Sequence, residues 1–173
     1  MGNKNKLPDV FNSDQLVQLM DSIDRPKVAI ATALGFFCGM RISEICNLKM
    51  EHIDLEKKRL KVVDSKFSMR TKTGYGKDRY IVIPDQMINP LKKWKDIMGG
   101  GKWFLQSHKS PDLPMSKKSL GEQYRQALDK AGLLIPDYDL TFKQKIFGEV
   151  KEKTITRYKY NLLVFFHFFT NFS

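Results

Sequence analysis

The sequence predicts a mixed α+β fold, mainly α-helical, with a small antiparallel β-hairpin. Three observations predict it: an apolar run over 28–38, two β-branched runs separated by a basic stretch, and helical spacing of apolar residues in the second half. The chain has 173 residues, 42% of them hydrophobic, which suits one domain with its own core. Its 28% charged and 12% aromatic content is that of a folded protein, which excludes an intrinsically disordered chain.

Two helices are predicted before residue 40. Ser13 fits the N-cap of a short helix whose apolar face lies within 16–20. Pro26 fits the first turn of a second helix, and 26–38 is apolar on nearly all sides, so we expect this helix at the centre of the core. Gly39 marks a break between this helix and the next segment of the chain.

The middle of the chain changes character. After Gly39, helical spacing resumes as far as Leu48, and residues 59–64 and 79–84 then have the composition of strands. The stretch between these strands is rich in Lys, Arg, Thr and Gly, which predicts a hairpin tip or an ordered loop.

Two further helices are predicted in the second half, and the pattern then degrades. Residues 86–98 and 116–132 have helical spacing, with Ala131-Gly132 as the end of the later helix. Residues 143–160 show no clear period, so no element is predicted there.

Charge favours a polyanionic partner. The chain has 30 basic and 19 acidic residues, a net charge of +11 and a pI near 9.6. Much of the excess lies within 56–79, where nine basic and three acidic residues give a net charge of +6. Charge alone does not identify nucleic acid, because many basic proteins bind none.

The cysteines and the lengths of the apolar runs indicate in which cellular compartment the protein is expected. Cys38 and Cys46 lie more than one helical turn apart, so we expect reduced, buried, structural thiols. No secretory signal opens the chain, and no apolar run approaches the roughly 18 residues of a membrane helix. A cytoplasmic protein without a membrane partner is the expectation.

Two short sequence motifs occur about thirty residues apart in the first half of the chain. Gly-Met-Arg-Ile-Ser-Glu stands at 39–44, and Thr-Lys-Thr-Gly stands at 71–74 between the two predicted strands. Leu48 to Asp54 adds a Leu-x-x-x-x-Ile-Asp continuation before the first strand. This combination resembles the catalytic domain of the tyrosine recombinases, the phage-integrase and Xer-like family, over about 7–133. The resemblance implies a mainly helical α+β domain with a hairpin or three-stranded sheet.

The resemblance implies that Arg41 is the first catalytic arginine and that Glu44 is the acidic partner that orients it. A fixed guanidinium matches a phosphate with two parallel hydrogen bonds, and preorganised donors stabilise the charge of a pentacovalent transition state. A purely structural alternative is an arginine that caps a helix end or pairs with Glu44, since the two are three residues apart. The two interpretations are compatible.

Lys72 matches the catalytic lysine of the family, which would protonate the departing 5′ oxygen. A lysine suits this role if neighbouring cations lower its pKa. Lys77 is the competing candidate, because Gly76-Lys77 also fits the family's pattern. The structural alternative is an edge hairpin that its lysines protect from aggregation.

Contacts to DNA are expected around the same hairpin, because hydroxyl and cationic side chains commonly bind backbone phosphates. The candidate DNA-binding residues are Arg70, Thr71, Thr73, Lys77 and Arg79.

The second half of the family's machinery is not recognisable. His-x-x-Arg occurs nowhere in the sequence, and Tyr158 and Tyr160 lack the sequence context of the family's nucleophile. We therefore divide the chain into a partial catalytic domain over 7–133 and a divergent tail over 134–173, disordered or read out of frame after a truncation or frameshift.

The resemblance implies DNA binding and site-specific recombination or integration, by strand breakage and rejoining through a phosphotyrosine. It implies no metal and no other cofactor. We expect little or no turnover from this chain. The expected partners are double-stranded DNA and, on it, a homo-oligomer or an intact recombinase. The alternative is a non-catalytic fragment that binds DNA or interacts with a recombinase.

Overall fold

The computed structural model describes residues 11–63, 78–146 and 149–158. It confirms a mixed, mainly helical fold with small antiparallel sheets. The elements in order are α1 (Ser13–Ser22), α2 (Pro26–Cys38), α3 (Ile42–Cys46), the 3-10 helix η1 (Met50–His52), β1 (Ile53–Asp54), β2 (Arg59–Val62), β3 (Arg79–Val82), α4 (Asp85–Met98), α5 (Lys117–Lys130), β4 (Pro136–Ile146) and β5 (Glu149–Tyr158).

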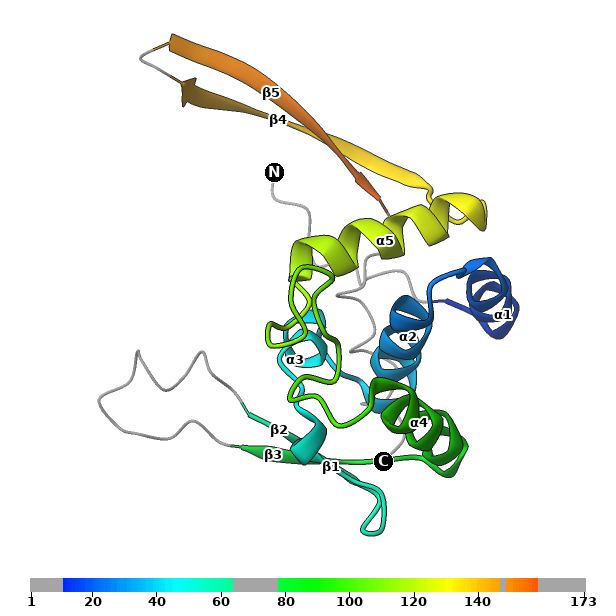
Figure 1. Ribbon diagram of the computed structural model, residues 1–173. Helices are drawn as coiled ribbons and strands as arrows, with labels where there is room; N and C mark the ends of the chain where they lie inside the picture. The colour runs from blue at the N-terminus through cyan, green and yellow to red at the C-terminus, as the bar shows by residue number, and fades with distance from the viewer. Residues whose placement is uncertain (1–10, 64–77, 147–148, 159–173) are drawn as a thin grey trace.

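Helix α2 lies at the centre of the molecule, as its sequence predicts. Pro26 occupies the first turn, and Gly39 ends the helix with a φ of 62°, which a residue without Cβ adopts at little cost. Leu34 is fully buried, and α2 packs against α3, α4 and α5. Figure 1 shows α5 lying across one side of this helical group and the three-stranded sheet at the opposite side.

The three-stranded sheet joins the core through one face. Its order is β1-β2-β3 and both pairs are antiparallel, with Leu60 opposite Ile53 and Ile81. Leu60 and Val62 are buried, whereas Val82 is largely exposed, so one face of the sheet packs on the helices. The sheet thereby fixes the position of Arg79, the first residue of β3.

The N-cap of α1 differs from the prediction of Ser13. Asn12 is the cap: its side chain accepts a hydrogen bond from the Gln15 amide at 2.8 Å, and its own amide donates to Gln15 Oε1 at 3.1 Å. With Asn12 as the N-cap, Gln15 is the third residue of the helix, and a side chain at this position can accept a hydrogen bond from the N-cap amide. Two backbone amides at the start of the helix, those of Asn12 and Gln15, thereby gain partners.

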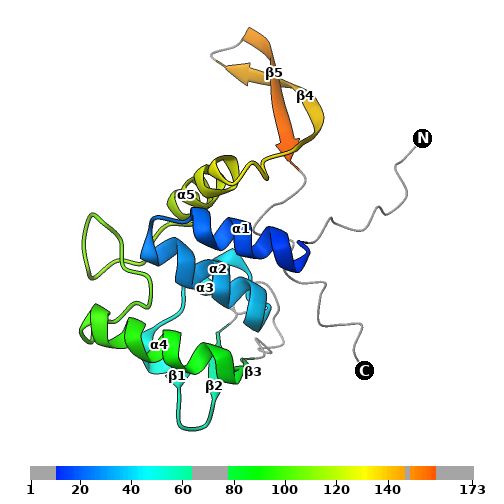
Figure 2. The ribbon, with the colours of Figure 1, turned by 90° about the vertical axis from the view of Figure 1, so that its right-hand side faces the viewer.

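A second hairpin follows α5, where the sequence predicts no element. Strands β4 and β5 pair antiparallel from Pro136↔Tyr158 to Ile146↔Glu149. In both ribbon views the hairpin extends beyond α5 and away from α1–α4 (Figures 1 and 2). Leu133 is the last residue of the buried core in the described part of the chain. The division at 133–134 stays a prediction.

The two cysteines lie as expected. Cys38 and Cys46 are free and buried, and burial raises the pKa of Cys38 to about 12 and that of Cys46 to about 11. A thiol with so high a pKa carries little thiolate near neutral pH, which agrees with a structural role.

Candidate active site

Arg41 lies at the turn between the central helix and α3. The chain leaves α2 through Gly39, buries Met40 at 1% exposure, and places Arg41 as the N-cap of α3. Ile45, one turn further on, is fully buried. The backbone of Arg41 is therefore fixed by buried neighbours on both sides, while 49% of its side chain remains exposed.

Glu44 holds the start of α3. Its Oε2 accepts a hydrogen bond from the backbone amide of Arg41 at 2.8 Å, and its Oε1 lies 3.7 Å from Arg41 Nη1. A carboxylate in the first turn also interacts favourably with the helix dipole. The structure thus brings together the two residues of the Gly-Met-Arg-Ile-Ser-Glu motif that the sequence singles out.

Arg79 completes the cluster from a distant part of the chain. Its Nη1 donates to Glu44 Oε1 at 2.8 Å and its Nη2 donates to Glu44 Oε2 at 2.9 Å. The side chain of Glu44 is only 9% exposed, so this two-point contact compensates a largely buried charge. We call Arg41, Glu44 and Arg79 the arginine–glutamate cluster.

The sequence did not reveal the link between Glu44 and Arg79. The sequence alone predicts that Arg79 contacts DNA and that Glu44 pairs with Arg41. The Arg41–Glu44 contact follows from a three-residue spacing, whereas Glu44 and Arg79 are 35 residues apart and meet only because β3 pairs with β2. No local spacing signals such a contact.

The remaining candidate residues lie outside the described residues. They are Arg70, Thr71, Lys72, Thr73 and Lys77. The two strands that flank these residues in the sequence are described, and Val62 at the end of β2 pairs with Arg79 at the start of β3. The chain therefore leaves and re-enters the sheet beside the arginine–glutamate cluster.

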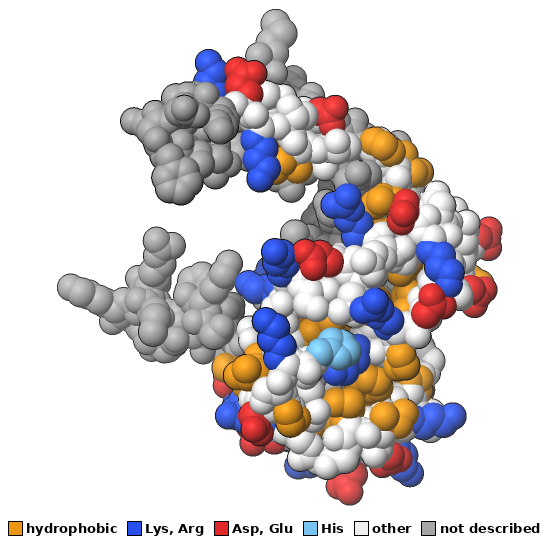
Figure 3. All heavy atoms as spheres, turned by 45° about the horizontal axis from the view of Figure 1, so that its top comes forward, with side chains coloured by type: hydrophobic (Ala, Val, Ile, Leu, Met, Phe, Trp, Pro, Cys, Tyr) orange, Lys and Arg blue, Asp and Glu red, His pale blue; other side chains and the backbone are white. Residues whose placement is uncertain are grey.

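The described basic residues of the sheet are largely neutralised by carboxylates. Lys58 bonds Asp85 at 2.6 Å, Arg59 lies 3.3 Å from Asp54, and Lys61 bonds Asp78 at 2.8 Å. The hydrogen bond and charge of Asp78 raise the pKa of Lys61. Figure 3 shows that cationic and anionic side chains are interspersed on one face of the molecule. The net charge of 56–79 does not translate into a uniformly basic described surface.

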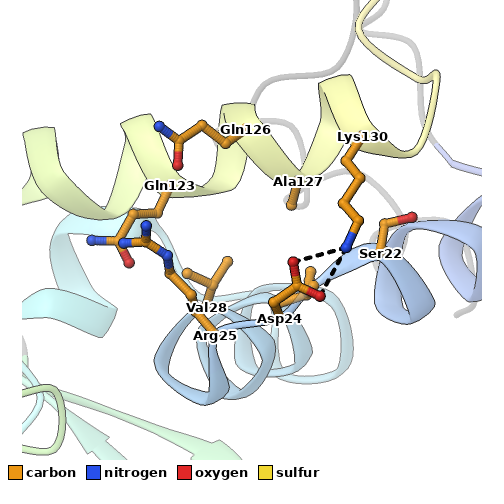
Figure 4. Close-up of a pocket in the computed structure, with 9 residues that line it drawn as sticks. Ser22, Asp24, Arg25, Val28, Gln123, Gln126, Ala127 and Lys130 are labelled. Carbon is orange, nitrogen blue, oxygen red and sulfur yellow. Dashed lines mark hydrogen bonds and ion pairs between the residues drawn. The ribbon is translucent and has the colours of Figure 1, made fainter.

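A separate polar groove lies between the α1–α2 turn and α5. It has a volume of about 150 Å³, and Figure 4 shows Asp24 paired with Lys130 at one end and Arg25 beside Gln123 at the other. Of the candidate residues that the structure describes, none of Arg41, Glu44 and Arg79 lines it.

Neither a metal cluster nor a membrane helix is found in the described residues. No group of three His, Cys, Asp or Glu side chains there is arranged to hold a metal ion. None of the helices in the same ranges has the length and apolar character needed to cross a membrane.

Solved structures share this fold. A crystal structure of XerA recombinase matches with a TM-score of 0.59 and 18% identity over 74% of this chain and 45% of that one. A lambda integrase (75–356) dimer bound to a COC′ core site matches with a TM-score of 0.56 and 22% identity, over 75% of this chain and 46% of that one.

The sequence comparisons define the family. The tyrosine recombinase XerA of Pyrococcus furiosus is 27% identical over 138 residues, which cover 78% of this chain and 46% of the relative. A tyrosine recombinase of Thermosipho africanus is 33% identical over 100 residues, covering 54% and 31%. The phage integrase family matches residues 9–144, and the chain belongs to that family. It spans less than half the length of these curated relatives.

Proposed function

We propose that this chain binds double-stranded DNA as part of a site-specific recombination or integration system, with Arg41 directed at a backbone phosphate. The observation that carries the proposal is an arginine whose backbone is anchored by the core while its guanidinium stays half-exposed. Membership of the phage integrase family supports it, as does the likeness to a lambda integrase dimer bound to a core site.

Each motif residue then has a distinct role. Arg41 would bind a non-bridging oxygen of the scissile phosphate, and Glu44 would hold Arg41 in place through the contacts seen in the structure. Lys72, or in its place Lys77, would supply a proton to the departing 5′ oxygen. Arg70, Thr71 and Thr73 would contact neighbouring phosphates.

The chain by itself should bind DNA with little or no turnover. Its sequence contains no His-x-x-Arg, and loss of one preorganised donor typically costs about 10²- to 10³-fold in rate. Tyr158 is the last residue of β5, while Tyr160 lies outside the described residues. Further recombinase subunits on the same DNA would be the protein partners, because lambda integrase is seen as a dimer and a tetramer on DNA.

Binding can be tested by fluorescence anisotropy with a labelled DNA duplex over a range of salt concentrations. We expect Arg41→Ala to lower affinity about tenfold and to reduce the salt dependence by about one phosphate contact. Arg25→Ala is the matched control, because it removes the same charge from the groove beside α5. Equal losses in both variants would show non-specific attraction and contradict the assignment of Arg41.

Turnover can be tested with a suicide DNA substrate that traps a covalent intermediate. We expect no protein–DNA adduct on a denaturing gel. An adduct that disappears in Tyr158→Phe or Tyr160→Phe would identify a nucleophile and refute the expectation of binding without turnover.

A further inference from the structure

Glu44 is shared by two arginines that approach it in different ways. Arg79 meets the carboxylate with two donors, at 2.8 and 2.9 Å. Arg41 meets it with its backbone amide at 2.8 Å, while its nearest guanidinium contact to Glu44 is 3.7 Å. The stronger side-chain bond of Glu44 is therefore to Arg79.

The burial of Glu44 makes this bond consequential. A carboxylate that is 9% exposed and loses its charged partner either reorients toward water or stays uncompensated at high cost. Reorientation would break the hydrogen bond to the Arg41 amide, which caps the five-residue helix α3. The conformation of Arg41 thus depends on a residue at the start of β3.

We propose that Arg79 is a positioning residue for Arg41 and acts through Glu44 rather than as a direct DNA contact. This inference rests on the proposed function, in which Arg41 binds a phosphate. Arg79 fixes both oxygens of Glu44, Glu44 fixes the start of α3, and Arg41 is held toward the phosphate. The same bond ties the sheet that flanks Lys72 to the helix turn that carries Arg41.

The direct alternative, a phosphate contact by Arg79, makes a different prediction for lysine. A lysine binds phosphate well as a point charge, but a single ammonium group cannot reproduce the two-point fork on Glu44. Arg79→Lys should therefore lose nearly as much DNA affinity as Arg79→Gln if Arg79 positions Arg41. It should retain most of the affinity if Arg79 contacts DNA.

A double-mutant cycle on DNA affinity tests the coupling, measured with a labelled duplex and the full chain well below its unfolding temperature. We expect Arg79→Gln to weaken binding about tenfold in the parent and to have almost no effect in an Arg41→Ala background. Arg59→Gln is the matched control, because Arg59 lies on the neighbouring strand and pairs with the more exposed Asp54. It should leave affinity within about twofold.

Each other outcome of the cycle overturns the inference. Additive losses for Arg79→Gln and Arg41→Ala would show an independent contact, as would full rescue by Arg79→Lys. An unchanged affinity in Arg79→Gln, with only a lower melting temperature, would show a purely structural ion pair.

NMR relaxation of the Arg41 Nε–Hε group gives a second readout that needs no DNA. The order parameter of this group should fall in Arg79→Gln and stay unchanged in Arg59→Gln. Unchanged order in both variants would overturn the inference. If the parent chain binds no DNA, the proposed function fails and the relaxation measurement alone decides whether Arg79 orders Arg41.

Discussion

The part of the molecule formed by α1–α5 and the three-stranded sheet, which we call the helical body, differs from the β4–β5 hairpin in how its apolar side chains are buried. Leu34 and Leu120 of the body are fully buried, whereas Leu140 and Ile155 of the hairpin keep 40% and 37% of their surface exposed. The body joins helices from both halves of the chain around one core. The hairpin is held by its backbone ladder and by cross-strand contacts such as that between the hydroxyls of Thr141 and Thr154, 3.0 Å apart. An isolated two-stranded hairpin is only marginally stable in water.

The candidate site lies in the helical body and not in the β4–β5 hairpin. Arg41 follows the buried α2, Glu44 lies one turn away, and Arg79 begins a strand whose sheet packs on the core. We therefore expect changes in the hairpin to leave the arginine–glutamate cluster intact and changes in the core to disturb it.

Thiol reactivity should show the largest difference between the two regions. Burial raises the pKa of Cys38 to about 12 and that of Cys46 to about 11, whereas an exposed thiol introduced by Leu140→Cys should keep a pKa near the ordinary cysteine value of 9.0. Alkylation by iodoacetamide at about pH 8, followed by peptide mass spectrometry, should label the introduced thiol about a thousandfold faster than Cys38.

The same pKa shift has a stability consequence whose sign is fixed. Since Cys38 favours the neutral thiol in the folded state, its contribution is fully present below its ordinary pKa of 9.0 and is lost as pH rises toward about 12. Rapid labelling of Cys38 in the folded protein near pH 8 would contradict its burial.

Truncation of the central helix should have the next largest effect. Leu34 is 0% exposed at the contact of α2 with its neighbours, so Leu34→Ala should lower the free energy of unfolding by about 2–5 kcal/mol. Urea denaturation followed by circular dichroism measures it. Leu140→Ala, which removes the same atoms from a half-exposed site, is the control and should cost much less. Equal losses would mean that the hairpin shares the core.

The sequence was sufficient for the parts of the fold with local signals. Pro26 and Gly39 mark the ends of α2, and β-branched runs mark β2 and β3. The second hairpin escaped prediction because apolar residues alternate clearly only in its first strand, where they stand at 138, 140 and 142. Its backbone ladder is a cross-strand property that single-strand patterns do not reveal.

In the candidate site, contacts between residues close in the sequence can be predicted, whereas contacts between distant residues cannot. The contact of Arg41 with Glu44 follows from helical spacing, but the bond from Glu44 to Arg79 depends on the register of β3 against β2. The catalytic and DNA-binding roles of these residues stay predictions.

Removal of the cap of α1 should have a smaller effect than a core truncation. Asn12→Ala removes the acceptor of the Gln15 amide, so it should destabilise the protein by about 1 kcal/mol. Ser13→Ala is the control, because the sequence favours Ser13 as the cap whereas the structure places it inside the helix. Thermal unfolding should distinguish the two variants, and a larger loss in Ser13→Ala would restore the sequence-based assignment.

Ile155→Ala should have the smallest effect. The side chain is 37% exposed and lies opposite Leu140 in the hairpin ladder, so its truncation removes a cross-strand contact without opening a cavity in the core. We expect the free energy of unfolding of the body to fall by less than about 0.5 kcal/mol, with unchanged DNA affinity.

Native-state hydrogen exchange shows where this small loss acts. Amides of β4 and β5 should exchange faster in Ile155→Ala, while those of α2 keep the protection set by global unfolding. If the amides of the hairpin exchange more slowly than those of α2 in the parent protein, the hairpin is the more stable region and our expectation is wrong. Faster exchange of α2 in the variant would show that hairpin and body unfold as one unit. Unchanged protection of α2 would mean that the body, with the arginine–glutamate cluster, is stabilised independently of the hairpin.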